Sequence, residues 1–272
     1  ALMLLALGAA NTAFLANHFL GRYVALEIVA LCVALLPLVA FRDSAAGIRL
    51  SSAIYLLLRL GDAGLLVAIL ELEAVSGTLF ITPALQAGEA LSGAPLQTMV
   101  VGFVLAVWVK LGGWPFHLWG QAGRRLALAP RLWLYATLVP SLGAYLLYRV
   151  TPLLAVSSAL QTAVLWMGAG GALLTALILT QTDQDRMLAY AGALQGGLIL
   201  CVAAAGVKYA GWFGLLAFIP VRLLLFLSID LAKRSRLPTW RRVAVALFVL
   251  GGVAWVTLDM LHIWWAGKGG AS

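Results

Sequence analysis

The sequence predicts an all-α membrane protein, a polytopic bundle of about nine transmembrane helices. Of its 272 residues, 63% are hydrophobic and 10% charged, and the mean hydropathy is +1.01. Soluble domains are roughly half apolar and a quarter charged. A spanning helix needs about 20 apolar residues. The apolar runs that approach or exceed this length fill the chain: 1–16, 23–41, 50–74, 95–120, 131–150, 158–180, 187–206, 210–233 and 243–265.

The Lys and Arg residues between these runs predict the orientation. One set of alternate connections holds Arg42, Arg49, Arg124, Arg125, Arg131, Arg186, Lys233, Arg234, Arg236, Arg241 and Arg242. The other set holds only Arg22, Arg149, Lys208 and Lys268. Cytoplasmic loops carry the excess of basic residues, so we expect the first set and the N-terminus in the cytoplasm and the C-terminus outside. Topology thus explains the net charge of +8 without nucleic acid, although the cluster 233–242 also suits anionic lipids.

The connections predict how the helices follow one another. The longest, 75–94 (SGTLFITPALQAGEALSGAP), carries no Lys or Arg and is expected as an external loop. The others are short, so consecutive helices should be antiparallel neighbours. The stretches GAGG (168–171) and GALQGG (192–197) predict close helix packing through small residues. The first run is short and the chain lacks an initiator Met, so we expect a processed or truncated N-terminus.

Lys110 is the most informative residue of the chain. It ends the apolar run MVVGFVLAVWVK (99–110) and precedes LGGWPFHLW (111–119), in which Pro115 should break the helix. Intramembrane charge is costly and usually functional, and helices broken at membrane depth tend to line ion or substrate paths. The alternative is that Lys110 extends from a helix end to the membrane interface.

Four further ionisable residues lie inside the apolar runs, as Lys110 does. They are Glu27, Arg59, Asp62 and Arg222. Nothing near Glu27 in the sequence neutralises it, so it needs a partner from another helix, and Lys110 is the expected one. Burial disfavours the charged form of a lysine, whereas a nearby carboxylate favours it. A lysine held between these effects can take up and release a proton.

The remaining candidates have weaker support. Arg59 and Asp62, three residues apart, share a helix face, and a self-neutralising pair is as good an interpretation as a functional one. His117 either relays protons or is hydrogen-bonded at the helix break. Tyr135, with Thr137, is a candidate for a hydroxyl or water chain. Arg222, which follows Pro220 as Lys110 precedes Pro115, suggests an inverted repeat and acts as a fixed charge.

Several classes of protein are disfavoured. Cys32, Cys201 and the three histidines have no metal-ligand spacing. The glycine-rich stretches lack the basic residue of a phosphate loop, and no nucleophile–base set is present. We therefore expect no metal, no cofactor and no catalytic chemistry.

Four segments resemble a known family. These are RLGDAGLL (59–66), KLGGWPFHLW (110–119), GAYLLYR (143–149) and QTDQDRMLAYAGALQ (181–195). In this order they are similar to the antiporter-like membrane subunits of respiratory complex I. The relatives of that family include Mrp cation/proton antiporters, membrane-bound hydrogenases and the membrane subunit of inorganic-carbon uptake systems. The resemblance divides the chain into an antiporter-like transmembrane core, 1–235, and a basic loop with a final transmembrane helix, 236–272.

The resemblance also implies roles for single residues. Glu27 would be the glutamate that pairs with the broken-helix Lys110, and Asp62 the acidic residue beside them. Arg222 stands where the family has a second lysine, Tyr135 where it often has histidine or lysine, and Phe218 where another histidine is common. The chain therefore resembles a truncated or divergent member in which the first half of the proton path is kept.

The function implied is a proton-translocating subunit of a larger energy-coupled complex in a bacterial or archaeal cytoplasmic membrane. Its partners would be a redox, hydrogenase, carbonic-anhydrase-like or further antiporter-like subunit, together with lipids. Protons taken up at Lys110 would leave towards a partner subunit or a local cavity, with Arg222 as an electrostatic barrier. The alternatives are a non-conducting scaffold and a cation/proton antiporter in which Glu27 and Asp62 help to bind sodium.

Overall fold

A computed structural model of the chain describes residues 1–41, 44–122, 126–179, 184–206 and residue 223. In this part the chain is helical apart from its connections and one isolated bridge between His18 and Phe80. The helices are α1 (Leu2–Leu15), α2 (Phe19–Ala40), α3 (Ala45–Ser76), α4 (Ile81–Gly88), α5 (Gly93–Leu111), α6 (Leu118–Ala122), α7 (Leu128–Pro130), the π-helix η2 (Arg131–Leu138), α8 (Val139–Ala155), α9 (Ser158–Leu179) and α10 (Gln184–Ala204).

Within the described ranges, five helices are long and apolar enough to cross a membrane. They are Phe19–Ala40, Ala45–Ser76, Gly93–Leu111, Arg131–Ala155 and Ser158–Ile178. The apolar helices Leu2–Leu15 and Ala189–Ala204 are shorter. The predicted runs 210–233 and 243–265 lie outside the described residues. The all-α membrane class is confirmed, whereas the number of nine spans stays a prediction.

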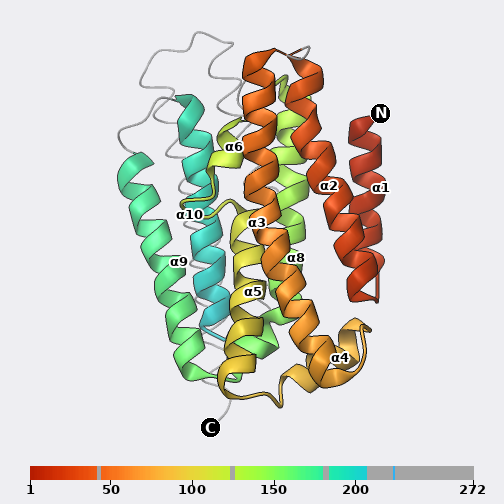
Figure 1. The fold of residues 1–272 in the computed structure, drawn as a ribbon. Coiled ribbons are helices and arrows are strands. Elements are labelled where there is room, and N and C mark those ends of the chain that lie inside the picture. The colour runs from red at the N-terminus through yellow and green to blue at the C-terminus, as the bar shows by residue number, and fades with distance from the viewer. Residues whose placement is uncertain (42–43, 123–125, 180–183, 207–222, 224–272) are drawn as a thin grey trace.

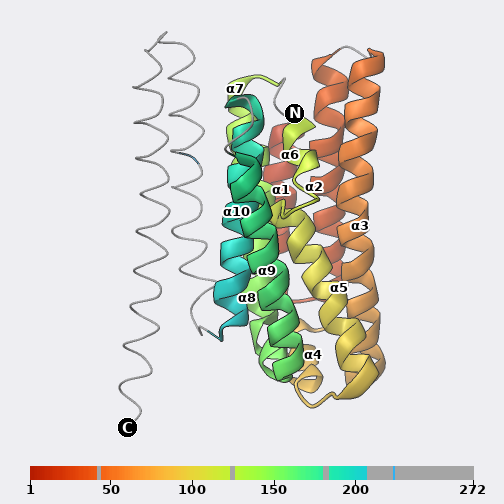
Figure 2. The same cartoon turned by 90° about the vertical axis from the view of Figure 1, so that its left-hand side faces the viewer.

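The long helices run alternately up and down the bundle (Figure 1). Most connections are short, which favours antiparallel neighbours because they leave no chain for a crossover. α3 packs against both α2 and α5, α5 packs against α8, and α9 pairs with α10. α3 and α9 therefore lie on opposite sides of the described bundle, as the second view makes plain (Figure 2).

Two elements differ from the expectation. The segment 75–94 was expected as a loop, but it contains the helix α4. Backbone hydrogen bonds from Phe19 N to Leu79 O (2.8 Å) and from Ile81 N to Asn17 O (3.1 Å) join it to the α1–α2 turn. The run 131–150 begins as a π-helix before it continues as α8. Hydropathy alone distinguishes neither feature, because both keep apolar side chains on a helical backbone.

Candidate functional site

The predicted break in the fifth helix is confirmed. α5 ends at Leu111, and α6 begins only at Leu118. Gly112 ends α5 in a left-handed conformation, with φ of 71°, and its N–H bonds to the carbonyl of Val109 at 3.0 Å. Glycine adopts this conformation without the steric cost that a side chain brings. The break leaves Lys110 in the last turn of a helix that stops inside the bundle.

Lys110 forms a buried ion pair with Asp62 of α3. The Lys110 Nζ donates to Asp62 Oδ1, and the two residues are 3% and 0% exposed. Asp62 lies 14 residues from the nearer end of α3, roughly 21 Å along a helix that rises ~1.5 Å per residue. The pair is therefore buried inside the helix bundle, where Lys110 is turned towards Asp62 instead of extending to the surface.

Small residues bring the helices close enough for this pair. A Cβ atom on Gly64 of α3 would come within 2.9 Å of the carbonyl oxygen of Gly102 on α5. One turn along, a Cβ atom on Gly61 would lie 2.9 Å from Val109 Cβ. The glycines on either side of Asp62 thus let the α3 backbone approach α5, so that a short aspartate reaches Lys110.

α8 supports Lys110 from a second side. A Cβ atom on Gly143 would lie 2.9 Å from Lys110 Cβ and 3.1 Å from the backbone nitrogen of Leu111. Nothing larger than hydrogen fits at Gly143 unless one of the two helices moves. The GAYLLYR segment therefore fixes the position of the lysine by close packing.

This packing gives a first testable prediction. Gly143→Ala should lower the thermal stability of the protein by about 1–3 kcal/mol, the usual cost of overpacking a core, and should impair function by displacing Lys110. The matched control is Gly170→Ala in α9, where an added Cβ meets nothing within 4 Å. Thermal unfolding of the purified protein in nanodiscs measures both variants. Equal stability of the two would contradict the packing argument.

A second ion pair lies between α2 and α3. The guanidinium of Arg59 contacts Glu27 Oε1, and its Nε donates to the hydroxyl of Tyr55 at 2.9 Å. The side chains of Arg59 and Glu27 are 40% and 12% exposed, so this pair is nearer the surface than Lys110–Asp62.

The predicted Glu27–Lys110 pair is therefore wrong in this structure. α3 packs between α2 and α5, so its acidic residue reaches Lys110 while its arginine reaches Glu27. Arg59 and Asp62 also do not neutralise each other, since each pairs with another helix. The four residues form a row of alternating charges that runs from Glu27 through Arg59 and Asp62 to Lys110.

The exposure of the outer pair gives a second prediction. Glu27→Gln should reduce proton transport by no more than about tenfold, or roughly 1.4 kcal/mol of barrier. Asp62 still lies opposite Lys110 in this variant, although Arg59 freed from Glu27 can compete for it, and a partly exposed ion pair is worth less than a desolvated one. Glu73→Gln, which changes an exposed glutamate near the end of α3, is the control and should behave as wild type. The proton flux of proteoliposomes measures both. Complete loss in Glu27→Gln would mean that transport requires an ionisable group at Glu27, either to carry the proton or to control Arg59.

His117 and Tyr135 lie close to the break. His117 is buried, and its ring packs on Tyr190 of α10 with 4.6 Å between centroids. Tyr135 belongs to the π-helix η2, and its hydroxyl donates to the carbonyl of Val33 on α2 at 3.0 Å. Its ring also lies 5.9 Å from that of Trp119. These contacts bring both residues to the break but do not join either to Lys110.

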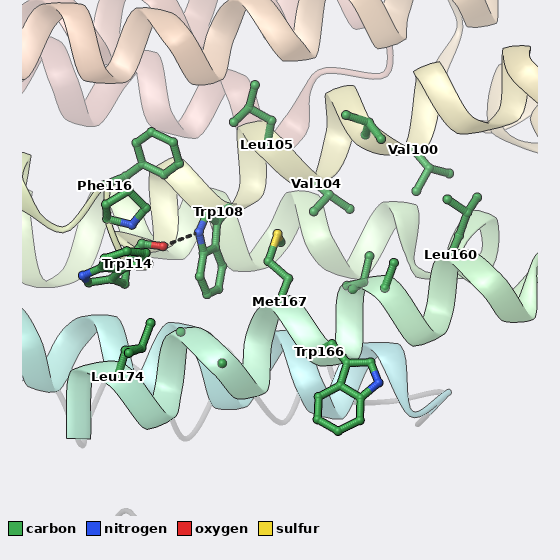
Figure 3. A pocket seen from close by; sticks show the side chains of 16 residues that line it. Val100, Val104, Leu105, Trp108, Trp114, Phe116, Leu160, Trp166, Met167 and Leu174 are labelled. Carbon is green, nitrogen blue, oxygen red and sulfur yellow. Dashed lines mark hydrogen bonds between the residues drawn. The ribbon is translucent and has the colours of Figure 1, made fainter. Parts of the chain in front are cut away.

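An apolar groove of about 600 Å³ lies on the other side of the break, between α5, the 114–116 segment and α9. Figure 3 shows Trp108 and Met167 on its opposite walls and the hydrogen bond from Trp108 Nε1 to the carbonyl of Trp114, which is 2.9 Å long. The lining offers almost no hydrogen-bonding group. The groove therefore does not stabilise water or protons on a path to Lys110.

Arg22 is a buried charged residue that the sequence did not predict, because the sequence analysis placed it in a connection between helices. The residue is 4% exposed in the first turn of α2. It donates to the carbonyls of Ala13 (2.9 Å) and Ala16 (2.8 Å) at the end of α1 and to the hydroxyl of Tyr145 (3.4 Å). The negative end of a helix stabilises a cation, so Arg22 fastens α1 to α8. Arg22 immediately precedes the second apolar run. The sequence therefore does not distinguish an arginine in a loop from one in the first turn of a helix.

Arg222 and Phe218 lie outside the described residues. The proposed barrier role of Arg222 and the inverted repeat therefore stay predictions.

Comparisons with known proteins agree on one family. The model of the family described as NADH:quinone oxidoreductase/Mrp antiporter, transmembrane, matches residues 16–260. A putative antiporter subunit mnhA2 of Staphylococcus epidermidis (strain ATCC 12228 / FDA PCI 1200) is 30% identical over 152 residues, 55% of this chain and 19% of the relative. The NADH-quinone oxidoreductase subunit N of Azoarcus sp. (strain BH72) is 30% identical over 204 residues, 70% of this chain and 40% of the relative.

Solved structures share the fold. A chain of the Mrp complex from Dietzia sp. DQ12-45-1b superposes with a TM-score of 0.77 at 23% identity, covering 86% of this chain and 26% of that one. A chain of the membrane-bound sulfane sulfur reductase, an archaeal respiratory membrane complex, gives 0.71 at 19% identity, covering 95% and 58%. The chain thus spans less than half the length of the two sequence relatives.

Proposed function

This chain belongs to the NADH:quinone oxidoreductase/Mrp antiporter transmembrane family, and from that premise we propose that it translocates or admits protons as one membrane subunit of a larger energy-coupled complex. It would perform no catalysis itself. A partner subunit would supply redox energy or would consume the proton gradient, for example in inorganic-carbon uptake.

The buried Lys110–Asp62 ion pair carries this proposal. Lys110 has a titratable ammonium group and ends a half-helix inside the bundle. While Asp62 is ionised, the lysine keeps its proton. When that counter-charge is withdrawn, the ammonium is left uncompensated in a low-dielectric interior and its proton is released. The pair thus acts as a proton site controlled by one carboxylate.

Arg59 supplies a means of withdrawing the counter-charge. It lies three residues before Asp62 on the same helix face, and it now holds Glu27. Protonation of Glu27 would free Arg59 to turn towards Asp62, which would then bind Lys110 less tightly. Because Arg59 itself stays protonated, it would transmit the change without carrying the proton.

The surroundings of Lys110 limit the proton route. The groove towards α9 is apolar, so the route would run on the α3 and α8 side of the break. Tyr135 already donates its hydroxyl proton to Val33 O, which makes it a weak onward carrier. His117, buried beside Tyr190, is the other titratable candidate. We propose that protons continue towards a partner subunit or a local cavity.

Two other functions follow from specific observations. Cation/proton antiport is favoured by the acidic residues Glu27 and Asp62, and a non-conducting scaffold by Tyr135 in place of a titratable relay group.

Proton flux in proteoliposomes distinguishes the three functions. The complex that contains this chain is reconstituted, a potassium diffusion potential is imposed, and a lumenal pH dye is followed with and without Na⁺. A proton subunit gives flux that is independent of Na⁺. Flux that requires Na⁺ would indicate antiport, and flux no greater than that of empty liposomes would indicate a scaffold.

A further inference from the structure

The outer surface of α2 and α3 carries a charged side chain, Arg59, whose exposure to lipid would be energetically costly. The side chain of Arg59 is 40% exposed and lies 14 residues from the start of the 32-residue helix α3. A hydrocarbon core of ~30 Å takes about 20 helical residues, so Arg59 falls within it from whichever end the helix enters. With α3 centred in the core, Arg59 lies within about two residues of its middle, and from there its side chain is too short to reach either interface.

The surroundings of Arg59 are otherwise typical of a membrane-facing surface. Leu56 (66% exposed), Leu60 (45%) and Val67 (45%) form a stripe along α3, and Val24 (52%) and Leu31 (41%) form a parallel stripe on α2. We call these five residues with Arg59 the Arg59 face. α3 lies at the edge of the described bundle away from α9 (Figure 2), so the face points outwards.

The known contacts of Arg59 leave hydrogen-bonding capacity unused. A guanidinium has five N–H donors. The Nε donor goes to Tyr55, and one terminal nitrogen contacts Glu27. An arginine exposed to hydrocarbon is costly even with one counter-ion, and a lipid tail offers no acceptor. Lipid phosphates lie beyond the hydrocarbon core, more than about 15 Å from the bilayer centre.

From this charge pattern we propose that the Arg59 face is the docking surface for a transmembrane helix of another subunit, which presents a hydrogen-bond-accepting side chain to Arg59 at mid-membrane. Apolar stripes on either side would pack against that helix, while the acceptor would satisfy the guanidinium. A second copy of this chain fits less well, because a two-fold interface would bring two arginine clusters together. The inference rests on the proposed membership of a larger complex.

Such an acceptor would also regulate the proposed proton site. A carboxylate brought to Arg59 would compete with Glu27 for it, and Arg59 leads directly to Asp62 and Lys110. A conformational change in the partner could thereby reach the buried pair without any movement of α5. The interface would be the point at which the driving subunit acts.

Spin-label accessibility tests whether the face is covered. Single cysteines replace Leu56 or Leu60 in a Cys32→Ser/Cys201→Ser background, since the chain has only these two cysteines. The labelled complex is purified in native nanodiscs, and oxygen accessibility is compared with that of a single lipid-exposed reference helix. We expect accessibility at both positions to be several-fold below the reference. Reference-level values at both would overturn the proposal.

Photo-cross-linking from position 60 then identifies what covers the face. Mass spectrometry should find the adduct on a transmembrane residue of a different subunit, within one helical turn of an acceptor side chain. An adduct on lipid, on another segment of this chain or on a second copy would overturn the proposal. Val24 is the alternative attachment site if a label at 60 prevents assembly. Neither readout measures conduction, so a covered face in a non-conducting complex would refute the proposed function alone.

Discussion

Lys110→Ala should abolish proton flux while the complex still assembles. The variant removes the titratable group at the end of α5, and the described residues offer no second lysine near the break. Assembly should persist because Asp62, left without its partner at 0% exposure, can take up a proton and become neutral. The expected result is flux at the level of empty proteoliposomes and a normal subunit ratio on gel filtration.

The control for Lys110→Ala is Leu173→Ala, a change of comparable size at an exposed position of α9 (62% exposed). It should leave both flux and assembly unchanged. Wild-type flux in Lys110→Ala would reduce this chain to a scaffold.

Asp62→Asn should have the second largest effect, on both stability and flux. It leaves the Lys110 ammonium 3% exposed with no counter-ion, and breaking one partner of a buried pair costs about 3–5 kcal/mol. The lysine is then expected to lose its proton and stay neutral, because the charged form would be buried without a counter-ion, so it can no longer take up and release a proton. Thermal unfolding should show the destabilisation, and flux should approach that of Lys110→Ala.

A double variant separates the two effects of Asp62→Asn. Lys110→Met/Asp62→Leu removes both charges from the buried site, and replacing a buried pair by apolar residues is often neutral or stabilising. It should recover stability without recovering flux. A double variant as unstable as Asp62→Asn would mean that the loss comes from disrupted packing at Gly61 and Gly64 rather than from an unpaired charge.

The fold was largely predictable, because its main features depend on local patterns. Apolar runs determined the spans, and Gly112 with Pro115 determined where α5 stops. The π-helix η2 and the helix α4 were not predictable from hydropathy, since their side chains are compatible with ordinary helix and loop as well. The packing of Gly61 and Gly64 around Asp62 was present in the sequence but had meaning only once α5 was known to be the neighbour.

The partners of the charged residues were harder to predict than the residues themselves. Glu27, Arg59, Asp62 and Lys110 are conspicuous in apolar runs, yet which acid meets the lysine depends on the order in which helices pack. α3 lies between α2 and α5. Asp62 of α3 therefore pairs with Lys110 in place of Glu27, and Glu27 pairs with Arg59. Arg22 was missed for a similar reason, because its partners are backbone carbonyls of α1, which leave no trace in side-chain composition.

The proton flux of Lys110→Arg tests the central claim most directly. Arginine keeps the positive charge opposite Asp62 but does not release its proton at physiological pH, so the variant separates a proton carrier from a fixed charge. We expect Lys110→Arg complexes to assemble with the wild-type subunit ratio and to show no more flux than Lys110→Ala. Wild-type flux in Lys110→Arg would contradict the claim that Lys110 takes up and releases the transported proton.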